Sequence, residues 1–299
     1  KIGDFMAYDM PDVDDFEDVS CPDFFKLDDK WVLICISHPR GARYYIGEWD
    51  GKQFKPESHH RMNWPGGPFF APETLVDGKG RRILWAWIMD RKEGVSSGTM
   101  SMPRVLSLAK DKLSLNIEPP KEVEQLRYDP SKEKPFSVAA GQSVTLKNVE
   151  GNILEMDVII APGESKRFGI KVLCSNDGRE QTPILIDCDK NIIQIDMRLS
   201  SIDKPNYPEF NIPWSYVLNP KPNVETLDAP FKIKKGEKVH LRIFLDKSIL
   251  EVFANGRQCI SQVVYPTLQD AVHVQVFADD APIKVESLKA WKLFPSMQW

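Results

Sequence analysis

The stretch HLRIFLDKSILEVFANGRQCISQVVYP, residues 240–266, alternates apolar and polar side chains in the manner of β-strands. Leu241, Ile243 and Leu245 would face one side of a strand, and Arg242 and Phe244 would face the other. The polar residues at 246–248 and the Asn-Gly pair at 255–256 divide the stretch into three short pieces, as turns do. The stretch therefore predicts three antiparallel strands joined by tight turns.

The same period of two runs through the C-terminal half of the chain. Segments such as GNILEMDVII (151–160) and VHVQVFAD (272–279) place apolar residues at every second position. Short polar turns separate them, and no helical pattern intervenes that could connect parallel strands. We therefore predict an antiparallel β-sandwich over residues 136–299.

Residues 117–135 differ in composition from the alternating segments after them. They contain four prolines, and Lys121 to Arg127 is the one convincing helical pattern in the chain. Pro120 would fit the first turn of that helix, where a missing N–H costs little. We predict a linker with a short helix at 117–135, which separates two domains.

Strand pairs also dominate residues 1–116. An apolar run covers 31–38, and hairpin patterns lie at 43–54, around Asp50-Gly51, and at 71–88. Strand pairs at this spacing with aromatic ends are typical of propeller blades or of a sandwich. The fold class predicted for the whole chain is therefore all-β.

Composition excludes several classes of function. The 299 residues carry 39 basic and 43 acidic side chains, so no broad basic field favours a nucleic-acid partner. No window of 18 apolar residues predicts a membrane span. The five cysteines form no Cys-x-x-Cys pair, which argues against a disulfide framework or a zinc site and favours buried thiols. The chain opens in the middle of a pattern, so we expect an N-terminal part to precede Lys1.

Four motifs, in order along the chain, resemble glycoside hydrolase family 32, the invertase, levanase and inulinase family. They are SCPDFF (20–25), FFAPETLVDGKGRRILWAWIM (69–89), SMPRVLSL (101–108) and R-x-F-x-D-x-S-x-x-E-V-F-x-N-G (242–256). The resemblance covers essentially the whole chain. It implies a five-bladed β-propeller, of which residues 1–116 hold the C-terminal blades, followed by an antiparallel β-sandwich. It also implies retaining cleavage of β-fructofuranosides such as sucrose, inulin or levan, with no metal or organic cofactor.

The resemblance also shows two departures. The family's early Asn-Asp-Pro-Asn-Gly-type motif, which carries the nucleophile, does not occur here. Ser20 occupies the position of the family's acid/base glutamate, and a hydroxyl cannot donate a proton as a carboxylic acid does. Three accounts remain open: the acid was lost, it moved to a nearby residue, or the alignment is offset by a few residues.

Two carboxyl groups are candidates for a relocated acid. Glu73 stands where the family usually has glutamine, and it ranks first. Asp18 ranks second, because strand parity places it on the face of Ser20, whereas Glu17 and Asp23 would point the other way. Against both, acidic side chains are usually solvated, and the run DVDDFED (12–18) has the composition of an exposed acidic loop.

Further residues are candidates for substrate binding. Trp64, in the loop NWPGG, could stack on a sugar ring, and Trp87 matches a pocket tryptophan of the family although Ala86 replaces the preceding glycine. His38, Arg40 and Arg43 could donate hydrogen bonds to hydroxyls or to a phosphate. Core packing or surface exposure is the alternative for each. The full set of binding candidates is Asp23, Trp64, Phe70, Trp87 and Arg43.

The expected partners are a fructoside substrate and the missing propeller blades, which we expect to pack on residues 1–116. The sandwich of the family sometimes dimerises, so a homodimer is also an expectation. Two other functions stay open: a fructan-binding relative that does not cleave, and a related furanosidase or fructosyltransferase with a relocated acid.

Overall fold

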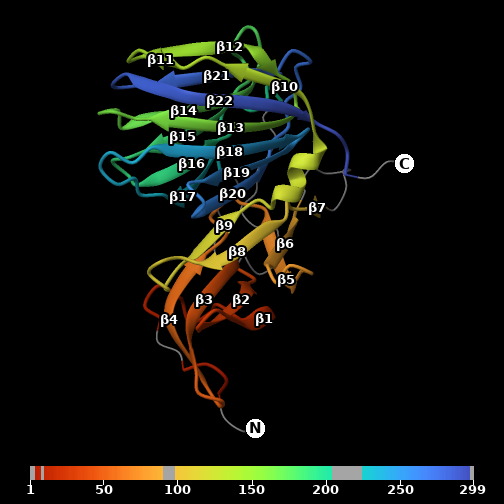
Figure 1. Ribbon diagram of the computed structural model, residues 1–299, viewed down its shortest axis with the longest axis vertical. Coiled ribbons are helices and arrows are strands. Elements are labelled where there is room, and N and C mark those ends of the chain that lie inside the picture. The colour runs from red at the N-terminus through yellow and green to blue at the C-terminus, as the bar shows by residue number, and fades with distance from the viewer. Residues whose placement is uncertain (1–3, 8–9, 90–97, 204–223, 297–299) are drawn as a thin grey trace. The chain divides into compact units, whose positions relative to one another are not determined.

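The computed structural model describes residues 4–7, 10–89, 98–203 and 224–296. The described residues form two compact units, with the boundary between Pro120 and Lys121. The first unit precedes this boundary and the second lies after it. Figure 1 shows that both are built almost entirely from strands.

The first unit contains two antiparallel sheets in which neighbours in sequence are neighbours in space. One sheet has the order β1 (Ser20–Leu27), β2 (Lys30–Ser37), β3 (Gly41–Trp49), β4 (Phe54–Arg61). The other has the order β5 (Phe69–Val76), β6 (Arg82–Ile88), β8 (Arg104–Leu108), β9 (Leu115–Glu118), and β7 (Thr99–Met100) pairs with β6. This meander topology is that of propeller blades. Strand β5 packs against β1, β2 and β3, so the two blades share a core.

Aromatic residues fill the first blade. Its core contains Leu33, Cys35, Tyr45 and Phe54, which are at most 1% exposed. The Phe24 ring stacks on Trp31 with centroids 4.8 Å apart. Continuous burial of β2 explains why its sequence reads as an unbroken apolar run.

The second unit is a β-sandwich of two antiparallel sheets (Figure 1). One sheet has the order β10, β22, β13, β18, β19, β20, with β11 beside β22, and the other has the order β12, β21, β14, β15, β16, β17. The bounds in the first sheet are β10 (Arg127–Glu133), β11 (Phe136–Val138), β13 (Ile153–Ala161), β18 (Val239–Asp246), β19 (Ile249–Ala254), β20 (Gln258–Val263) and β22 (Ile283–Leu293). Those in the second are β12 (Gln142–Glu150), β14 (Arg167–Cys174), β15 (Thr182–Asp187), β16 (Ile192–Asp196), β17 (Thr226–Pro230) and β21 (His273–Ala278).

The predicted alternation is confirmed at the stretch that indicated the sandwich. Leu241, Ile243 and Leu245 are all 0% exposed on β18, as one face of a strand buried against a second sheet requires. Strand β18 pairs with β19 from Leu241–Ala254 to Asp246–Ile249. Lys247, at the turn, has a positive φ of 55°, which a tight hairpin demands.

The predicted linker over 117–135 is wrong in its extent. A 3₁₀ helix, η1, covers Lys121–Leu126 as expected, but residues 127–133 form β10, an edge strand of the sandwich. The prolines misled the prediction because Pro130 lies at a register shift between Tyr128 and Ser131. A bulge on an edge strand tolerates proline, since no ladder hydrogen bond is lost there.

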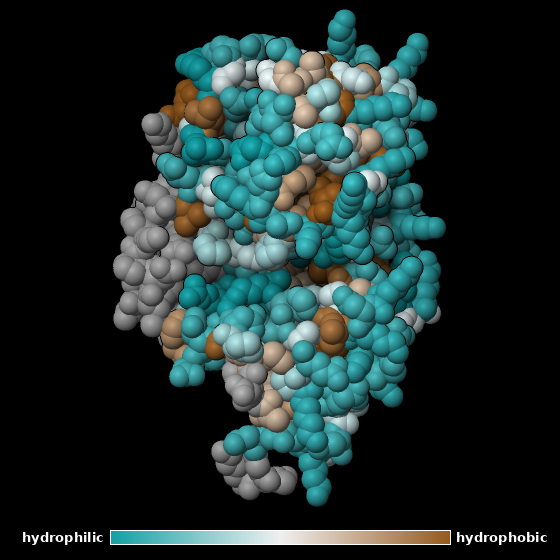
Figure 2. Space-filling view, turned by 90° about the vertical axis from the view of Figure 1, so that its left-hand side faces the viewer, coloured by the Kyte–Doolittle hydropathy of each residue, from teal (hydrophilic) through white to brown (hydrophobic). Residues whose placement is uncertain are grey.

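The cysteines and the surface have the character that the composition predicts. All five cysteines are free, and Cys35, Cys174 and Cys259 are buried. Hydrophilic residues dominate the face drawn in Figure 2, and hydrophobic ones appear in small separate groups. Within the described part of the chain, no helix has the length and apolar character needed to cross a membrane.

Candidate functional site

Strand β1 begins with a bulge at the position of the expected acid. Ser20 pairs with Ile36 and Asp23 pairs with Ile34, so two residues lie between Ser20 and Asp23 where the partner strand has one. Cys21 has a φ of 48°, in the left-handed region. The extra residue brings Ser20 and Asp23 to the same face of the sheet, because their partners share that face. The prediction that Asp23 points away from Ser20 is therefore wrong.

Strand β5 carries the same bulge. Phe70 pairs with Trp87 and Glu73 with Trp85, and Ala71 has a φ of 45°. Cys-Pro-Asp in β1 and Ala-Pro-Glu in β5 thus occupy equivalent places in the two blades. Asp23 corresponds to Glu73, and Ser20 corresponds to Phe70. The small-residue–Pro–acid pattern was visible in both stretches of sequence and would have predicted the second bulge from the first.

Asp23 and Glu73 lie close enough to influence one another. The Asp23 carboxylate accepts hydrogen bonds from the Thr74 backbone N–H, at 3.0 Å, and from the Thr74 hydroxyl. Partial burial raises the pKa of Glu73, and the negative charge of Asp23 raises it further. Asp23 therefore ties the two blades together as an acceptor, and its charge favours the protonated form of the Glu73 carboxyl group.

Asp18, Ser20 and His38 form a hydrogen-bonded group. The Ser20 hydroxyl donates to Asp18 Oδ2 at 2.7 Å, and the His38 backbone N–H donates to Asp18 Oδ1 at 2.8 Å. His38 Nδ1 lies 2.6 Å from Asp18 Oδ2. Burial opposes ionisation of Asp18, but these bonds outweigh it and lower the pKa. Asp18 is therefore an ionised acceptor, which argues against it as a proton donor.

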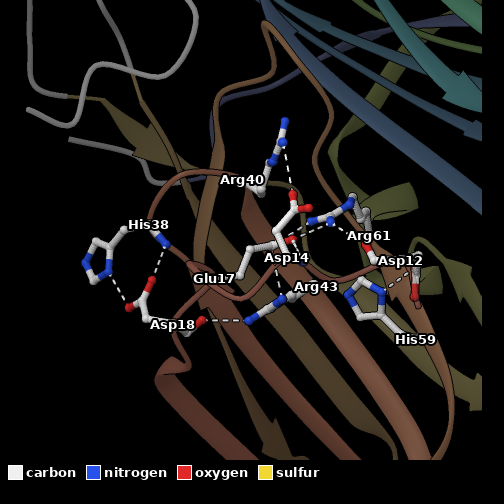
Figure 3. Close-up of polar contacts among 9 residues, drawn as sticks. All are labelled: Asp12, Asp14, Glu17, Asp18, His38, Arg40, Arg43, His59 and Arg61. Atoms are coloured by element: carbon white, nitrogen blue, oxygen red, sulfur yellow. Dashed lines mark hydrogen bonds and ion pairs between the residues drawn. The ribbon is translucent and has the colours of Figure 1, made fainter. Parts of the chain in front are cut away.

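The acidic segment 12–18 is only partly the exposed loop that its composition predicts. Asp12 and Asp14 are exposed, but the Glu17 side chain is 0% exposed. Its carboxylate accepts from Arg43 at 3.0 Å and from both Arg61 terminal nitrogens, the closer at 2.7 Å. Figure 3 shows Glu17 between the two guanidinium groups. An acid can be buried when cations satisfy it, and composition does not reveal such partners.

Arg43, which the sequence offered as a substrate ligand, lies in the protein interior. Its side chain is 0% exposed, and besides Glu17 it donates to the Asp18 backbone carbonyl at 2.6 Å (Figure 3). Burial of the Glu17 carboxyl opposes ionisation, but the hydrogen bond and charge of Arg61 and the charge of Arg43 lower its pKa to about 2. Glu17 and Arg43 therefore position the residues that lead into β1.

Aromatic rings lie beside the Asp18 group. The Phe70 ring centroid is 6.0 Å from that of His38 and 6.3 Å from that of Trp87. Trp87 is 40% exposed, whereas Phe70 is 7% exposed. Trp64 is half-buried in a turn in which the Gly67 N–H donates to the Trp64 carbonyl at 2.8 Å. Of the three candidate aromatic residues, Trp87 offers the most surface to a sugar ring.

The structure thus joins Ser20 to Asp18 by a hydrogen bond and places Asp23 near enough to Glu73 for its charge to act on that carboxyl group. Phe70 lies beside His38, and Trp87 lies beside Phe70. Sequence reasoning missed Glu17 as a buried group and Thr74 as the partner of Asp23. Among the residues that the structure describes, no group of three or more His, Cys, Asp or Glu side chains could hold a metal ion.

Known proteins share both units. Residues 10–119 match the glycosyl hydrolases family 32 N-terminal domain, and residues 122–292 match the glycosyl hydrolases family 32 C-terminal domain. The chain is 27% identical to levanase from Bacillus subtilis, over 93% of this chain and 44% of that protein. It is 26% identical to sucrose-6-phosphate hydrolase from Zymomonas mobilis, over 91% of this chain and 53% of that protein.

Solved structures agree on the fold. Fructan 1-exohydrolase IIa from Cichorium intybus superposes with a TM-score of 0.76 at 19% identity, over 92% of this chain and 61% of that one. The chain spans about half the length of the curated relatives it matches. Propeller blades followed by a sandwich, and family descriptions that match nearly every residue from 10 to 292, lead to one conclusion: the chain belongs to glycoside hydrolase family 32.

Proposed function

We propose that the protein containing this chain acts on β-fructofuranosides of the sucrose, inulin or levan type, by a retaining mechanism. The observation that carries the proposal is membership of family 32 across both units. Relatives named levanase and sucrose-6-phosphate hydrolase support the substrate class. The family consists of glycosidases. We infer the activity of the protein that contains this chain from its membership of that family.

A retaining reaction uses two carboxyl groups about 5–5.5 Å apart, one as nucleophile and one as acid/base. We propose that the nucleophile is not among these 299 residues, since its motif is absent from them. Ser20 cannot supply the proton. Glu73 is our first candidate for the displaced acid, because partial burial and the charge of Asp23 raise its pKa toward the range in which a general acid operates. Asp18 is a weaker second candidate because its pKa is lowered.

Protons and bonds balance in the proposed step. The Glu73 carboxyl gives its proton to the glycosidic oxygen as the bond between that oxygen and the fructosyl carbon breaks. The nucleophilic carboxylate forms a fructosyl ester in this first step. In the second step a water molecule attacks the ester and releases fructose, and the ionised Glu73 takes a proton from that water. Trp87 offers an exposed ring on which a sugar could pack. Asp23 stabilises the blade contact through Thr74 and holds the negative charge that tunes Glu73.

The second candidate function is a fructan-binding relative that does not cleave, and Ser20 is the observation that favours it. The deciding experiment measures fructose release from sucrose, inulin and levan by the full polypeptide that contains these residues. Calorimetry on the same sugars runs beside it. Release supports the hydrolase, and binding without release supports the second candidate. Chromatography of the products separates hydrolysis from fructosyl transfer by a related enzyme.

Glu73→Gln tests the relocated acid in an active protein. Loss of the acid should lower the release of fructose at least roughly 100-fold, which is typical of a general acid. Glu118→Gln is the matched control, since Glu118 is exposed on β9. Release unchanged by Glu73→Gln would exclude Glu73 and return attention to the residues around Ser20.

We further propose that another part of the same polypeptide packs on residues 1–116. Exposed apolar side chains on its strands support this: Leu75 is 48%, Val76 55% and Met100 64% exposed. A homodimer through the sandwich is the other proposed partner. Sedimentation of the full polypeptide at several concentrations checks the dimer, and a constant monomer mass would exclude it.

A further inference from the structure

The groups left open around position 20 are hydrogen-bond acceptors. An ionised carboxylate has about four acceptor positions, and Asp18 uses three of them for the His38 N–H, for His38 Nδ1 and for the Ser20 hydroxyl. The Ser20 hydrogen is committed to Asp18, so the Ser20 oxygen can only accept. Asp18 is 42% exposed at its side chain. A ligand that meets this pair must therefore donate hydrogens.

The charge around the pair is negative. Segment 12–18 carries five carboxyl groups, and three arginines from β3, β4 and the turn before β3 face it. Each arginine is already ion-paired. Arg40 lies 3.2 Å from Asp14, Arg43 lies 3.0 Å from Glu17, and Arg61 lies 2.7 Å from Glu17 (Figure 3). Arg40 and Arg43, which the sequence offered as donors to hydroxyls or to a phosphate, are thus paired with the protein's own acids, and His38, offered with them, contacts Asp18.

A row of three rings begins at His38, which contacts Asp18. The His38, Phe70 and Trp87 rings succeed one another at 6.0 and 6.3 Å. Acceptors beside an aromatic surface suit a sugar, which presents hydroxyl donors at its rim and C–H groups on its faces.

We propose that Asp18 and Ser20 form a binding site for a neutral, hydroxyl-donating sugar unit, and that they discriminate against phosphorylated sugars. This rests on the proposed function and specifies its substrate class: a free fructoside rather than a sugar phosphate. A phosphate monoester carries between one and two negative charges near neutrality and is chiefly an acceptor. Beside the Asp18 carboxylate it would meet like charge, and neither Asp18 nor Ser20 would offer it a hydrogen.

Calorimetry with sucrose and sucrose 6-phosphate, on the full polypeptide, tests the proposal. The wild type should bind sucrose at least roughly tenfold more tightly than the phosphate. Asp18→Asn removes the charge and keeps the shape, so the preference should fall at least roughly fivefold. Ser20→Ala should weaken both sugars and leave their ratio unchanged, because it removes an acceptor but no charge.

Asp15→Asn is the matched control, since Asp15 is exposed in the same segment and the change in charge is identical. It should leave the ratio within about twofold. Equal binding of the two sugars by the wild type, or a ratio unmoved by Asp18→Asn, would overturn the proposal. A protein that prefers sucrose but releases no fructose would leave this site standing and defeat the hydrolase. Binding of neither sugar would overturn this site, and fructose release from inulin or levan would then decide the hydrolase separately.

Discussion

Two glutamates in this chain have the same burial and the same kind of charged partners, but one lies in a β-sheet and the other in a segment outside the strands. Glu17, in the first unit, and Glu155, in the second, both have side chains that are 0% exposed. Each is held by two arginines: Glu17 by Arg43 and Arg61, and Glu155 by Arg127 and Arg242. In both places two guanidinium groups offset the cost of removing one carboxylate from water.

The difference lies in what else fixes each glutamate. Glu155 belongs to β13, and its arginines come from β10 and β18 of the same sheet, so backbone pairing already sets its place. Glu17 lies before β1, outside the strands, 26 and 44 residues from its partners. Its ion pairs therefore hold the segment that carries Asp18 and leads to Ser20. The same triad reinforces a sheet in one unit and positions a candidate site in the other.

The largest expected effect is on stability. Glu155→Gln and Glu17→Gln should each lower the free energy of unfolding by about 3 kcal/mol, because each removes a fully buried carboxylate that pairs with two arginines. Urea unfolding of the two variants measures this. A loss below about 1 kcal/mol in either variant would mean that water or another acid replaces the glutamate there.

The next effect, on sucrose affinity, should differ between the two glutamates. Glu17→Gln should weaken sucrose binding roughly tenfold, because the segment that carries Asp18 loses its attachment, whereas Glu155→Gln should leave it unchanged. Calorimetry without urea, at a temperature well below the unfolding midpoint of both variants, compares them. Equal loss of affinity in both variants would show that Glu17 acts through general stability and does not position the site.

The stability contributed by Glu17 should depend on pH. Its pKa in the folded protein is about 2, below the ordinary 4.5, so ionisation stabilises the fold above pH 4.5. That stabilisation should disappear as the pH falls from about 4.5 toward 2. Unfolding midpoints of wild type and Glu17→Gln should converge over this interval. A difference between the two unfolding midpoints that stayed constant with pH would contradict the lowered pKa of Glu17.

The smallest effect belongs to an exposed pair of the same segment. Arg40 and Asp14 are 34% and 51% exposed at their side chains, and water screens them. Asp14→Asn should change the free energy of unfolding by no more than about 0.5 kcal/mol. Urea unfolding of Asp14→Asn and Glu17→Gln compares their free energies of unfolding. It checks whether burial makes one acid contribute more to stability than another acid three residues away. A loss comparable to that of Glu17→Gln would show that exposure does not weaken an ion pair of this segment.

Local pattern predicted much of the fold. Alternation marked the strands of the sandwich, and the apolar run at 31–38 marked β2. The prediction failed where a strand departs from regular geometry. Proline suggested a linker at 130, but a bulge absorbs it in β10, and a bulge after Ser20 reverses the parity assumed for Asp23. A single extra residue changes which face every later side chain takes.

The candidate site was less predictable than the fold. Ser20, Glu73 and Trp87 came from motif comparison, and Asp18 came from strand parity with Ser20. The burial of Arg43 and Glu17 did not, because a charged residue is assigned to the surface unless its partners are known.

Neighbouring residues alone specify the strand periods, the two kinds of β unit, the family motifs and the serine at position 20. Tertiary contacts settle which acids are buried, which bases hold them and in which direction the pKa of each shifted carboxyl group moves. Those properties depend on side chains brought together across tens of residues, and a charge has no fixed energy until its surroundings are in place.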